Sequence, residues 1–446
     1  MDDLSKTLLN ICPLIDKHVN NKKIYNDSKQ INNDFINLDK NNSDMRQLLE
    51  YIFDNSIKTS HPMFLDKLYS GTNTVGVIGE LVTSILNTSM YTVKVAPLFS
   101  QMEVELINKI NKLVGYKQGG GIMTAGGSMG NLMALLCARY KYDNRVKYNG
   151  NMNNYTIICS KSSHFSIETS SIIMGLGLKS VIKVDVCLDG SMDMDNLEKV
   201  LIMCKEKGKK IIALVLTVGT TVKNGFDDIN KACEILNKYN EKCWIHVDGC
   251  IGGSLLFSNK YRELLDGLER VDSLTFNSHK MLGIPLQCSM LLTMDKDILK
   301  QSFALDVSYL YHDKSEDLGK NTIQCGRKVD ALTFWLSWKV LGFNYFRERV
   351  DKAVYEASRL YEFMNDDERF NVICKPNAFT LCFYPVGINF DNFMDGMKGK
   401  IMIDYTCDTD KYFRVVFNNP SACANDVYDL LVDIYGDICK SSFMKN

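Results

Sequence analysis

The sequence predicts an α/β protein in which helices flank a mostly parallel sheet and a smaller α+β region follows at the C-terminal end. Two observations support this prediction. Between about residues 104 and 292, short apolar runs alternate with amphipathic segments of helical period. Strands that are apolar throughout are typical of a parallel sheet that is covered on both faces. After about residue 340, a long helical segment leads instead into shorter strands.

The expected helices and strands alternate along the chain. Helices are predicted over residues 104–114, 129–142, 164–176, 194–208 and 226–240, and the glycine-rich residues 119–128 are expected to form a turn. Strands are predicted over residues 155–160, 180–186, 209–221, 243–249, 272–278 and 288–292. In the C-terminal region we expect a helix over 343–366, strands over 379–385 and 412–418, and a last helix over 424–438.

Changes in composition and in the expected secondary structure along the chain predict three parts. They are a helical and polar arm over residues 1–58, a large α/β domain over 59–340 and a small α+β domain over 341–446. Residues 20–42 are rich in Asn, Lys and Asp, a composition typical of a loosely held linker. The 446 residues, 46% of them hydrophobic, are enough for a large core and for two packed domains.

Composition argues against several classes of function. The formal net charge of −1 does not favour binding to nucleic acid, and the sequence contains neither a secretion signal nor an apolar run of about 18 residues that could span a membrane. Fifteen scattered cysteines are typical of reduced core thiols, so we expect a cytoplasmic protein. Cys243, His246 and Cys250 are close in sequence, but strand alternation places Cys243 and His246 on opposite faces, so no metal site is expected.

Polar residues follow several of the predicted strands, and the carboxyl ends of parallel strands are where open α/β sheets bind ligands. Gly127 and Ser128 begin a helix whose free N–H groups suit a phosphate. His164 follows a strand and begins a helix, and Thr217 lies at the end of a strand. Each feature alone has an ordinary structural explanation, such as a tight turn or a helix cap.

Asp248 and Lys280 complete the set. Burying a carboxylate at the end of an apolar strand is energetically costly unless a cation or strong donors lie beside it. A lysine next to such a strand is rarely buried without a partner or a functional role. Taken together, the set indicates pyridoxal 5′-phosphate: the glycine-rich helix start would bind the phosphate, and His164 would stack on the ring. Asp248 would hold a protonated ring nitrogen, and Lys280 would form an imine.

Two long motifs then show a family resemblance. Residues 246–258, "HVDGCIGGSLLFS", and 272–289, "DSLTFNSHKMLGIPLQCS", resemble the group II pyridoxal-phosphate decarboxylases, and most of all the glutamate, cysteine-sulfinate and aspartate decarboxylase branch. "SHPMFLDKLYSG", "TVGTTVKNGFD", "IQCGRKVDALTFWLSWK" and "YFRVVFNNP" match in the same order, from about residue 59 to the end. The resemblance implies a fold-type I enzyme that is a homodimer with its active sites at the subunit interface.

The resemblance also implies roles for single residues. Lys280 matches the Schiff-base lysine, Asp248 the partner of the pyridine nitrogen, and His164 the histidine that stacks on the ring. Tyr309 matches the tyrosine of a mobile loop that returns a proton, and Arg414 matches the arginine that clamps the acid group of the substrate. The other matches would contact the cofactor, mostly at its phosphate: Gly127, Ser128, Thr217, Ser278 and His279.

Four further residues bear on the choice of substrate. Lys67 replaces the glutamine usual in this branch and, if it faces the pocket, favours acidic side chains. A bulky Tyr69 would shorten the pocket, and Ser89 and Tyr91 resemble the sulfinate and aspartate enzymes. The expected substrate is therefore cysteine sulfinate or aspartate rather than glutamate. Other chemistry with the same cofactor stays open as an alternative (an aminotransferase, a cysteine desulfurase or an aldehyde synthase), as does a relative without catalytic activity.

Overall fold

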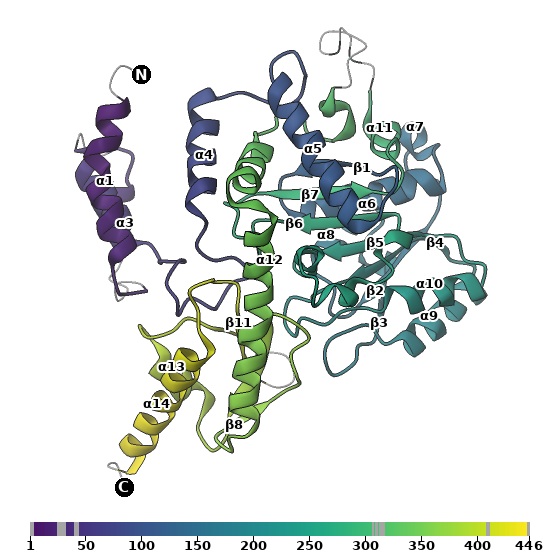
Figure 1. Ribbon diagram of the computed structural model, residues 1–446. Helices are drawn as coiled ribbons and strands as arrows, with labels where there is room; N and C mark the ends of the chain where they lie inside the picture. Colours follow the sequence, from purple (N-terminus) through teal and green to yellow (C-terminus); the bar gives the residue numbers. More distant parts are fainter. Residues whose placement is uncertain are drawn as a thin grey trace.

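The computed structural model describes residues 4–24, 33–39, 44–305, 307, 311, 317–406 and 411–443. Figure 1 shows a large sheet flanked by helices and a smaller sheet region toward the C-terminal end. The large sheet has seven strands and the small one has four. This arrangement confirms the predicted fold class.

The large sheet has the strand order β1-β7-β6-β5-β4-β2-β3, in which β7 is antiparallel to both β1 and β6 and the other neighbours are parallel. Its strands are β1 Gly120–Thr124, β2 Tyr155–Ser160, β3 Val181–Val184, β4 Lys210–Thr217, β5 Trp244–Gly249, β6 Ser273–Asn277 and β7 Ser289–Thr293. The small sheet is antiparallel in the order β10-β11-β9-β8, with strands β8 Phe370–Val372, β9 Thr380–Pro385, β10 Asp404–Thr406 and β11 Tyr412–Val416.

The helices account for most of the remaining described chain. In the first half they are α1 Leu4–Asn20, α2 Asn33–Ile36, α3 Met45–Asn55, α4 Thr74–Leu86, α5 Pro97–Val114, α6 Gly127–Tyr142, α7 Val146–Asn149 and α8 Ser166–Ile173. In the second half they are α9 Met194–Glu206, α10 Ile229–Lys238, α11 Ile298–Phe303, α12 Asp330–Asn365, α13 Phe390–Met397 and α14 Ala424–Phe443. Within the described residues, none of these helices combines the length and the apolar character that crossing a membrane requires.

The prediction of a turn over residues 119–128 was wrong for its first half. Gly120–Thr124 form strand β1, which pairs with β7 along its whole length. Glycine-rich runs have a low strand propensity, but pairing with a buried neighbour overrides it. A side chain at Gly121 would collide with the carbonyl oxygen of Leu291 and with Ile107, so the glycines allow the close approach.

The long helix α12 begins earlier than the predicted residue 343. It starts at Asp330 and contains a break at Gly342, where φ is +78° and ψ is 170°. Its first part packs against α4 and α5 and its second part against α14, so one helix connects the two sheets (Figure 1). The domain boundaries at residues 58 and 340 remain a prediction.

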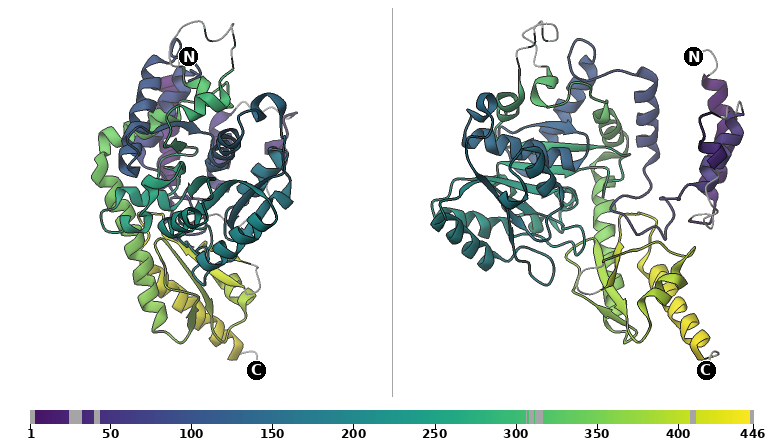
Figure 2. Two further views of the ribbon diagram at one scale, coloured as in Figure 1. Left: turned by 90° about the vertical axis from the view of Figure 1, so that its right-hand side faces the viewer. Right: turned by 180° about the vertical axis from the view of Figure 1, so that it is seen from behind.

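The N-terminal helices α1 and α3 pack against each other and stand beside the main body in both Figure 1 and Figure 2. The connection to the main body includes a contact of 2.9 Å between His61 Nε2 and the Lys22 carbonyl. Within the arm, the Lys58 N–H donates to the Ile24 carbonyl at 2.8 Å. Several large apolar side chains of this arm are exposed, including Leu9 and Ile52. This arrangement is typical of a segment that covers another surface.

A buried ion pair ties the edge of the large sheet to the loop before α12. Glu103 of α5 is 1% exposed and Arg327 is 3% exposed, and the two side chains are hydrogen-bonded. Glu103 also accepts a hydrogen bond from the backbone N–H of Met123 in β1, and Arg327 donates to the carbonyls of Met90 and Met123. The pair therefore holds the strand that leads into helix α6.

Replacing Glu103 with glutamine is expected to lower the free energy of unfolding by about 3–5 kcal/mol, because it leaves the buried charge of Arg327 without its counter-ion. Chemical denaturation of the purified protein measures this loss. Glu362→Gln is the matched control: it breaks an exposed pair with Arg359 and should cost less than about 1 kcal/mol. Equal losses in the two variants would show that the buried pair has no special role.

Candidate active site

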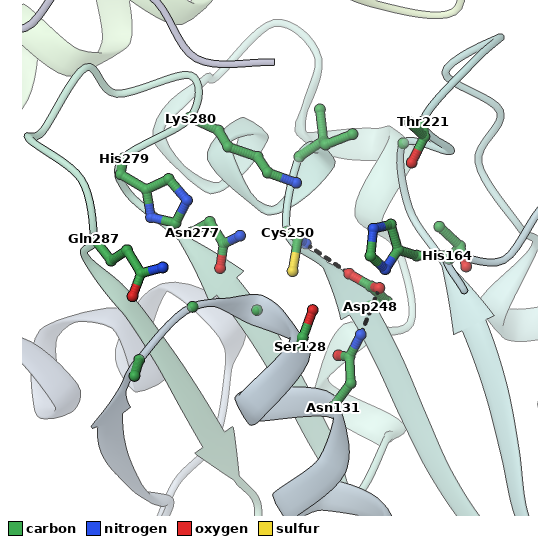
Figure 3. Close-up of a pocket in the computed structure, with 16 residues that line it drawn as sticks. Ser128, Asn131, His164, Thr221, Asp248, Cys250, Asn277, His279, Lys280 and Gln287 are labelled. Atoms are coloured by element: carbon green, nitrogen blue, oxygen red, sulfur yellow. Dashed lines mark hydrogen bonds between the residues drawn. The ribbon is translucent and has the colours of Figure 1, made fainter. Parts of the chain in front are cut away.

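A cavity of about 340 Å³ lies at the carboxyl ends of strands β4, β5 and β6, beside the first turn of helix α6 (Figure 3). Residues from these separate elements converge there. The lining residues are Ala125, Gly126, Gly127, Ser128, Asn131, His164, Thr217, Gly219, Thr221, Asp248, Cys250, Ile251, Asn277, His279, Lys280 and Gln287. The expected positions at the strand ends therefore meet in one place, as the topology of an open α/β sheet favours.

Asp248 is the buried anion of this cavity. Its Oδ2 accepts a hydrogen bond from Asn131 Nδ2 at 2.8 Å, and its Oδ1 accepts one from the backbone N–H of Cys250 at 3.1 Å. Burial alone would raise the pKa of the Asp248 carboxyl, but hydrogen bonding to Cys250 and Asn131 and the positive charge of Lys280 outweigh it, so the pKa is lower than usual. Asp248 is thus a carboxylate at neutral pH.

A chain of buried hydrogen bonds leads from strand β5 to Asp248. Trp244 Nε1 donates to Ser273 Oγ at 2.7 Å, Ser273 Oγ lies 2.8 Å from His246 Nδ1, and His246 Nε2 lies 3.0 Å from Asn131 Oδ1. Burial lowers the pKa of His246 to about 4, so the ring is neutral and each nitrogen has one role. Because the amide of Asn131 donates to Asp248, its oxygen is free to accept from His246. The chain fixes the orientation of the carboxylate.

The start of helix α6 forms the opposite wall. Gly126 has φ of +89°, a value that favours glycine, and no side chain in the described part of the chain caps the helix that begins at Gly127. A Cβ atom at Gly127 would collide with Cys250 Sγ and crowd Asn277 Nδ2, so a glycine keeps this wall open. With Ser128 beside it, the helix start presents backbone N–H groups and a hydroxyl to an anion.

His279 lies at the same end of the cavity as the helix start. Its Nδ1 accepts a hydrogen bond from the backbone N–H of Cys288 at 3.1 Å. Burial, joined by the charge of Lys280, lowers the pKa of His279 to about 4, so the ring is neutral. Nδ1 also lies 2.9 Å from the carbonyl oxygen of Cys288, so both backbone groups of that residue hold this edge of the ring.

Lys280 and His164 face each other across the cavity, and Figure 3 shows the amine of Lys280 pointing into it. Lys280 follows strand β6, and His164 lies in the loop between β2 and α8. Burial lowers the pKa of His164, and Lys280 lowers it further while Asp248 opposes the shift, so the imidazole is neutral. A neutral ring of this kind presents a flat face to an aromatic ligand.

Two buried polar atoms of the cavity have no hydrogen-bond partner within the described part of the chain. They are Thr217 Oγ1 and Asn277 Oδ1. Buried polar groups are nearly always paired, so orphaned atoms at a cavity point to a polar ligand. Together with an anion-binding helix start, a carboxylate and an amine, they fit a flat phosphorylated cofactor that has a ring nitrogen and an aldehyde.

Several predicted site residues lie elsewhere. The Ser278 hydroxyl donates to the Cys288 carbonyl at 3.0 Å, and Ser278 does not line the cavity. Tyr69, Ser89 and Tyr91 do not line it either: Tyr69 packs against Phe64, and Ser89 Oγ accepts a hydrogen bond from the Arg327 N–H. The prediction for Tyr309 lies outside the described residues.

Arg414 and Lys67 lie together behind the cavity wall. Arg414 Nη1 donates to the carbonyl of Thr221, a lining residue, at 2.8 Å, and Arg414 Nη2 donates to the carboxylate of Asp404 at 2.8 Å. Lys67 pairs with Asp66 at 3.0 Å and with Asp404 at 3.4 Å. The two expected substrate-binding cations are therefore neighbours, but both are engaged by acidic side chains.

Among the lining residues that sequence reasoning missed are Asn131, Cys250, Asn277 and Gln287. Asn131 could have been found, because it lies four positions after Gly127 and so on the same side of the helix. The sequence could also have indicated Asn277, because it is the last residue of the strand that precedes Lys280. For Cys250, which donates through its backbone, and for Gln287, which lies in a loop, the residue type carried no signal.

Comparisons with known proteins agree with this geometry. The chain matches the family described as "Pyridoxal-dependent decarboxylase conserved domain" over residues 20–385. It is 33% identical over 407 residues to a Bos taurus protein named acidic amino acid decarboxylase GADL1, an alignment that covers 85% of this chain and 78% of that protein.

Solved structures give the same result. Mouse CSAD has a TM-score of 0.90 and 30% identity, with 97% of this chain and 98% of that chain covered. An Oryza sativa TDC solved with PLP and tryptamine has a TM-score of 0.88 and 20% identity, with 98% of both chains covered, a likeness that shows the fold alone. This chain belongs to the pyridoxal-dependent decarboxylase family and is a pyridoxal-phosphate-dependent carboxy-lyase that acts on an amino acid.

Proposed function

We propose that this enzyme decarboxylates an acidic L-amino acid to the corresponding amine and carbon dioxide, and that it favours cysteine sulfinate or aspartate over glutamate. The observation that carries the proposal is the position of Arg414, whose guanidinium is hydrogen-bonded to a residue that lines the Lys280–Asp248 cavity. The name of the Bos taurus relative and the likeness to mouse CSAD also support it.

The lining residues suit distinct parts of the cofactor. Gly127, Ser128 and His279 surround the end where a phosphate would be bound by N–H and O–H donors. Asp248 would accept a hydrogen bond from the protonated ring nitrogen, and His164 would pack on the ring. When bound, pyridoxal phosphate supplies an electron sink for the pair left behind as carbon dioxide departs.

The protein residues would then divide the remaining work. The amine of Lys280 would hold the cofactor covalently and would give way to the amino group of the substrate. Arg414 orients the side-chain acid, which leaves the α-carboxylate as the group to be lost. Tyr309 would return a proton to the former α-carbon as general acid. Thr217, whose backbone N–H donates to Asp227 at 2.7 Å, would give its unpaired hydroxyl to the cofactor.

We also propose that the enzyme is a homodimer with active sites at the interface. Support comes from α1 and α3, which stand beside the main body and expose apolar side chains, and from helix α4, which exposes Val77, Ile78 and Leu86. A second copy would cover these surfaces. Tyr69, Ser89 and Tyr91 do not line the cavity within one chain, so any role in substrate choice would depend on this assembly. The free thiols of the described cysteines support a cytoplasmic location.

A substrate panel tests the proposed reaction. With aspartate, cysteine sulfinate and glutamate, the enzyme should release carbon dioxide and an amine, and kcat/KM for a C3 acid should exceed that for glutamate by about tenfold, the effect of one methylene in a shaped pocket. Mass spectrometry of the products separates this reaction from transamination, desulfuration and aldehyde formation. A preference for glutamate would contradict the choice of substrate, and a keto acid, sulfide or aldehyde product would contradict the reaction.

A further inference from the structure

Asp404 lies directly opposite Arg414 in the antiparallel register of strands β10 and β11. Residues opposed in this way have Cβ atoms only about 5 Å apart, so the backbone itself brings the two side chains together. Asp404 Oδ2 accepts a hydrogen bond from Arg414 Nη2 at 2.8 Å, and the Lys67 ammonium lies 3.4 Å from the same oxygen. One carboxylate thus lies between two cations.

The guanidinium of Arg414 is largely occupied. Besides Asp404, Nη2 donates to the Asp66 carbonyl at 2.7 Å, and Nη1 donates to the Thr221 carbonyl at 2.8 Å. Nε has no partner among the described residues, and the side chain is only 8% exposed, so packing limits its freedom to turn toward a new ligand. An incoming carboxylate that needs two parallel N–H bonds meets a guanidinium that already binds one.

The charges around Arg414 also balance. Arg414 and Lys67 are positive, and Asp404 and Asp66 are negative, with each acid within 4 Å of at least one cation. The group of four therefore offers no excess positive charge to an acidic ligand. Asp404 is the partner of Arg414 that is open to solvent, with 34% of its side chain exposed.

We propose that Asp404 is a specificity-determining residue, whose carboxylate engages Arg414 and thereby weakens the binding of amino acids with an acidic side chain. The inference rests on the proposed function, in which Arg414 binds the side-chain acid. A substrate acid must displace Asp404 or approach beside it, and two like charges at one cation lower affinity. Because the reacting carbon is not involved, KM changes and kcat does not.

Asp404→Asn in the full-length holoenzyme tests this role, since the amide keeps the size and removes the charge. We expect KM for the best acidic substrate to fall about tenfold while kcat stays within about twofold. The Kd of succinate, a dicarboxylate without an amino group, should fall by a similar factor in calorimetry. Asp391→Asn is the matched control, because it removes an exposed carboxylate paired with Lys411 near the same sheet, and it should leave both constants unchanged.

A double-mutant cycle shows whether Asp404 acts through Arg414. In an Arg414→Gln background, Asp404→Asn should change the Kd of succinate much less than in the wild type, because only Lys67 then remains beside Asp404. Asp404→Ser serves as a second variant, and thermal melting verifies that each protein is folded.

Unchanged KM and Kd in folded Asp404→Asn and Asp404→Ser would overturn the inference, as would an equal change in Asp391→Asn, which would indicate a general effect of charge. Failure of the proposed function has a different result: neither the wild type nor the variants would release carbon dioxide from any acidic amino acid. In that case the succinate Kd still decides whether Asp404 occupies the guanidinium.

Discussion

Replacing Lys280 with alanine is expected to lower kcat by at least about a thousandfold and to remove the visible absorption band of the holoenzyme. Among the described residues that line the cavity, only Lys280 carries a primary amine, and Figure 3 shows that amine directed inward between His164 and His279. A primary amine is the group that binds an aldehyde covalently. Without it, the cofactor can be held only by hydrogen bonds and stacking.

Three measurements separate a chemical role of Lys280 from a structural one. Release of the cofactor by denaturation shows how much remains bound in the alanine variant. Added ethylamine should restore part of the activity, because a free amine can replace the missing group and cannot repair a misfolded site. Lys161→Ala, on an exposed loop where Lys161 pairs with Asp185, is the control and should keep the band. An unchanged band in Lys280→Ala would contradict the assignment.

The sequence was sufficient to locate the centre of the site because its main residues share a topological position. All four main residues lie at the end of a strand or within four residues after it, and the ends of neighbouring strands converge in an open sheet. They are His164, Thr217, Asp248 and Lys280. No contact between distant residues had to be known. The chemistry of the side chains then indicated the ligand.

The parts that were missed depend on contacts that local patterns do not contain. Strand β1 looks like a glycine turn until its pairing with β7 is known. The helical spacing places Asn131 on the side of Gly127, but its hydrogen bond to Asp248 becomes evident only when β5 brings that carboxylate beside it. Tyr69 and Ser89 were expected to line the pocket. Instead, Tyr69 packs against Phe64, and Ser89 Oγ accepts a hydrogen bond from the backbone N–H of Arg327.

The pair formed by Arg414 and Asp404 shows the same limit for electrostatics. The sequence indicated a cation for the acid of a substrate, but the register of two short strands decides which acid of the protein already binds it. The presence of an arginine in the sequence therefore does not show how much positive charge is available to a ligand in the pocket.

Replacing Asp248 with asparagine is expected to lower kcat by about a hundredfold or more at saturating cofactor. The carboxylate is already held by Asn131 and the Cys250 N–H, two donors that suit an anion. An amide in its place carries no charge to stabilise a proton on the ring nitrogen of the cofactor. In one orientation, the NH₂ group of the amide would face one of these two donors. In the other orientation, the NH₂ group would face the ring nitrogen, where an acceptor is needed.

The pH dependence of kcat gives a second expectation for the charge of Asp248. The folded-state pKa of Asp248 is lower than the usual value, so its charge is present above that usual value and is lost only as the pH falls through the lower one. The pH profile of kcat for the wild type should therefore show no loss between about pH 5 and pH 8 that traces to Asp248.

Asn131→Ala provides the graded comparison for Asp248→Asn. It keeps the carboxylate but removes one donor and breaks the chain to His246, so kcat should fall by about tenfold, less than in Asp248→Asn. If the two variants lost the same activity, the charge of Asp248 would matter no more than its orientation. If Asp248→Asn kept the wild-type kcat, Asp248 would not be the partner of the ring nitrogen, and the cofactor would have to lie differently in the cavity.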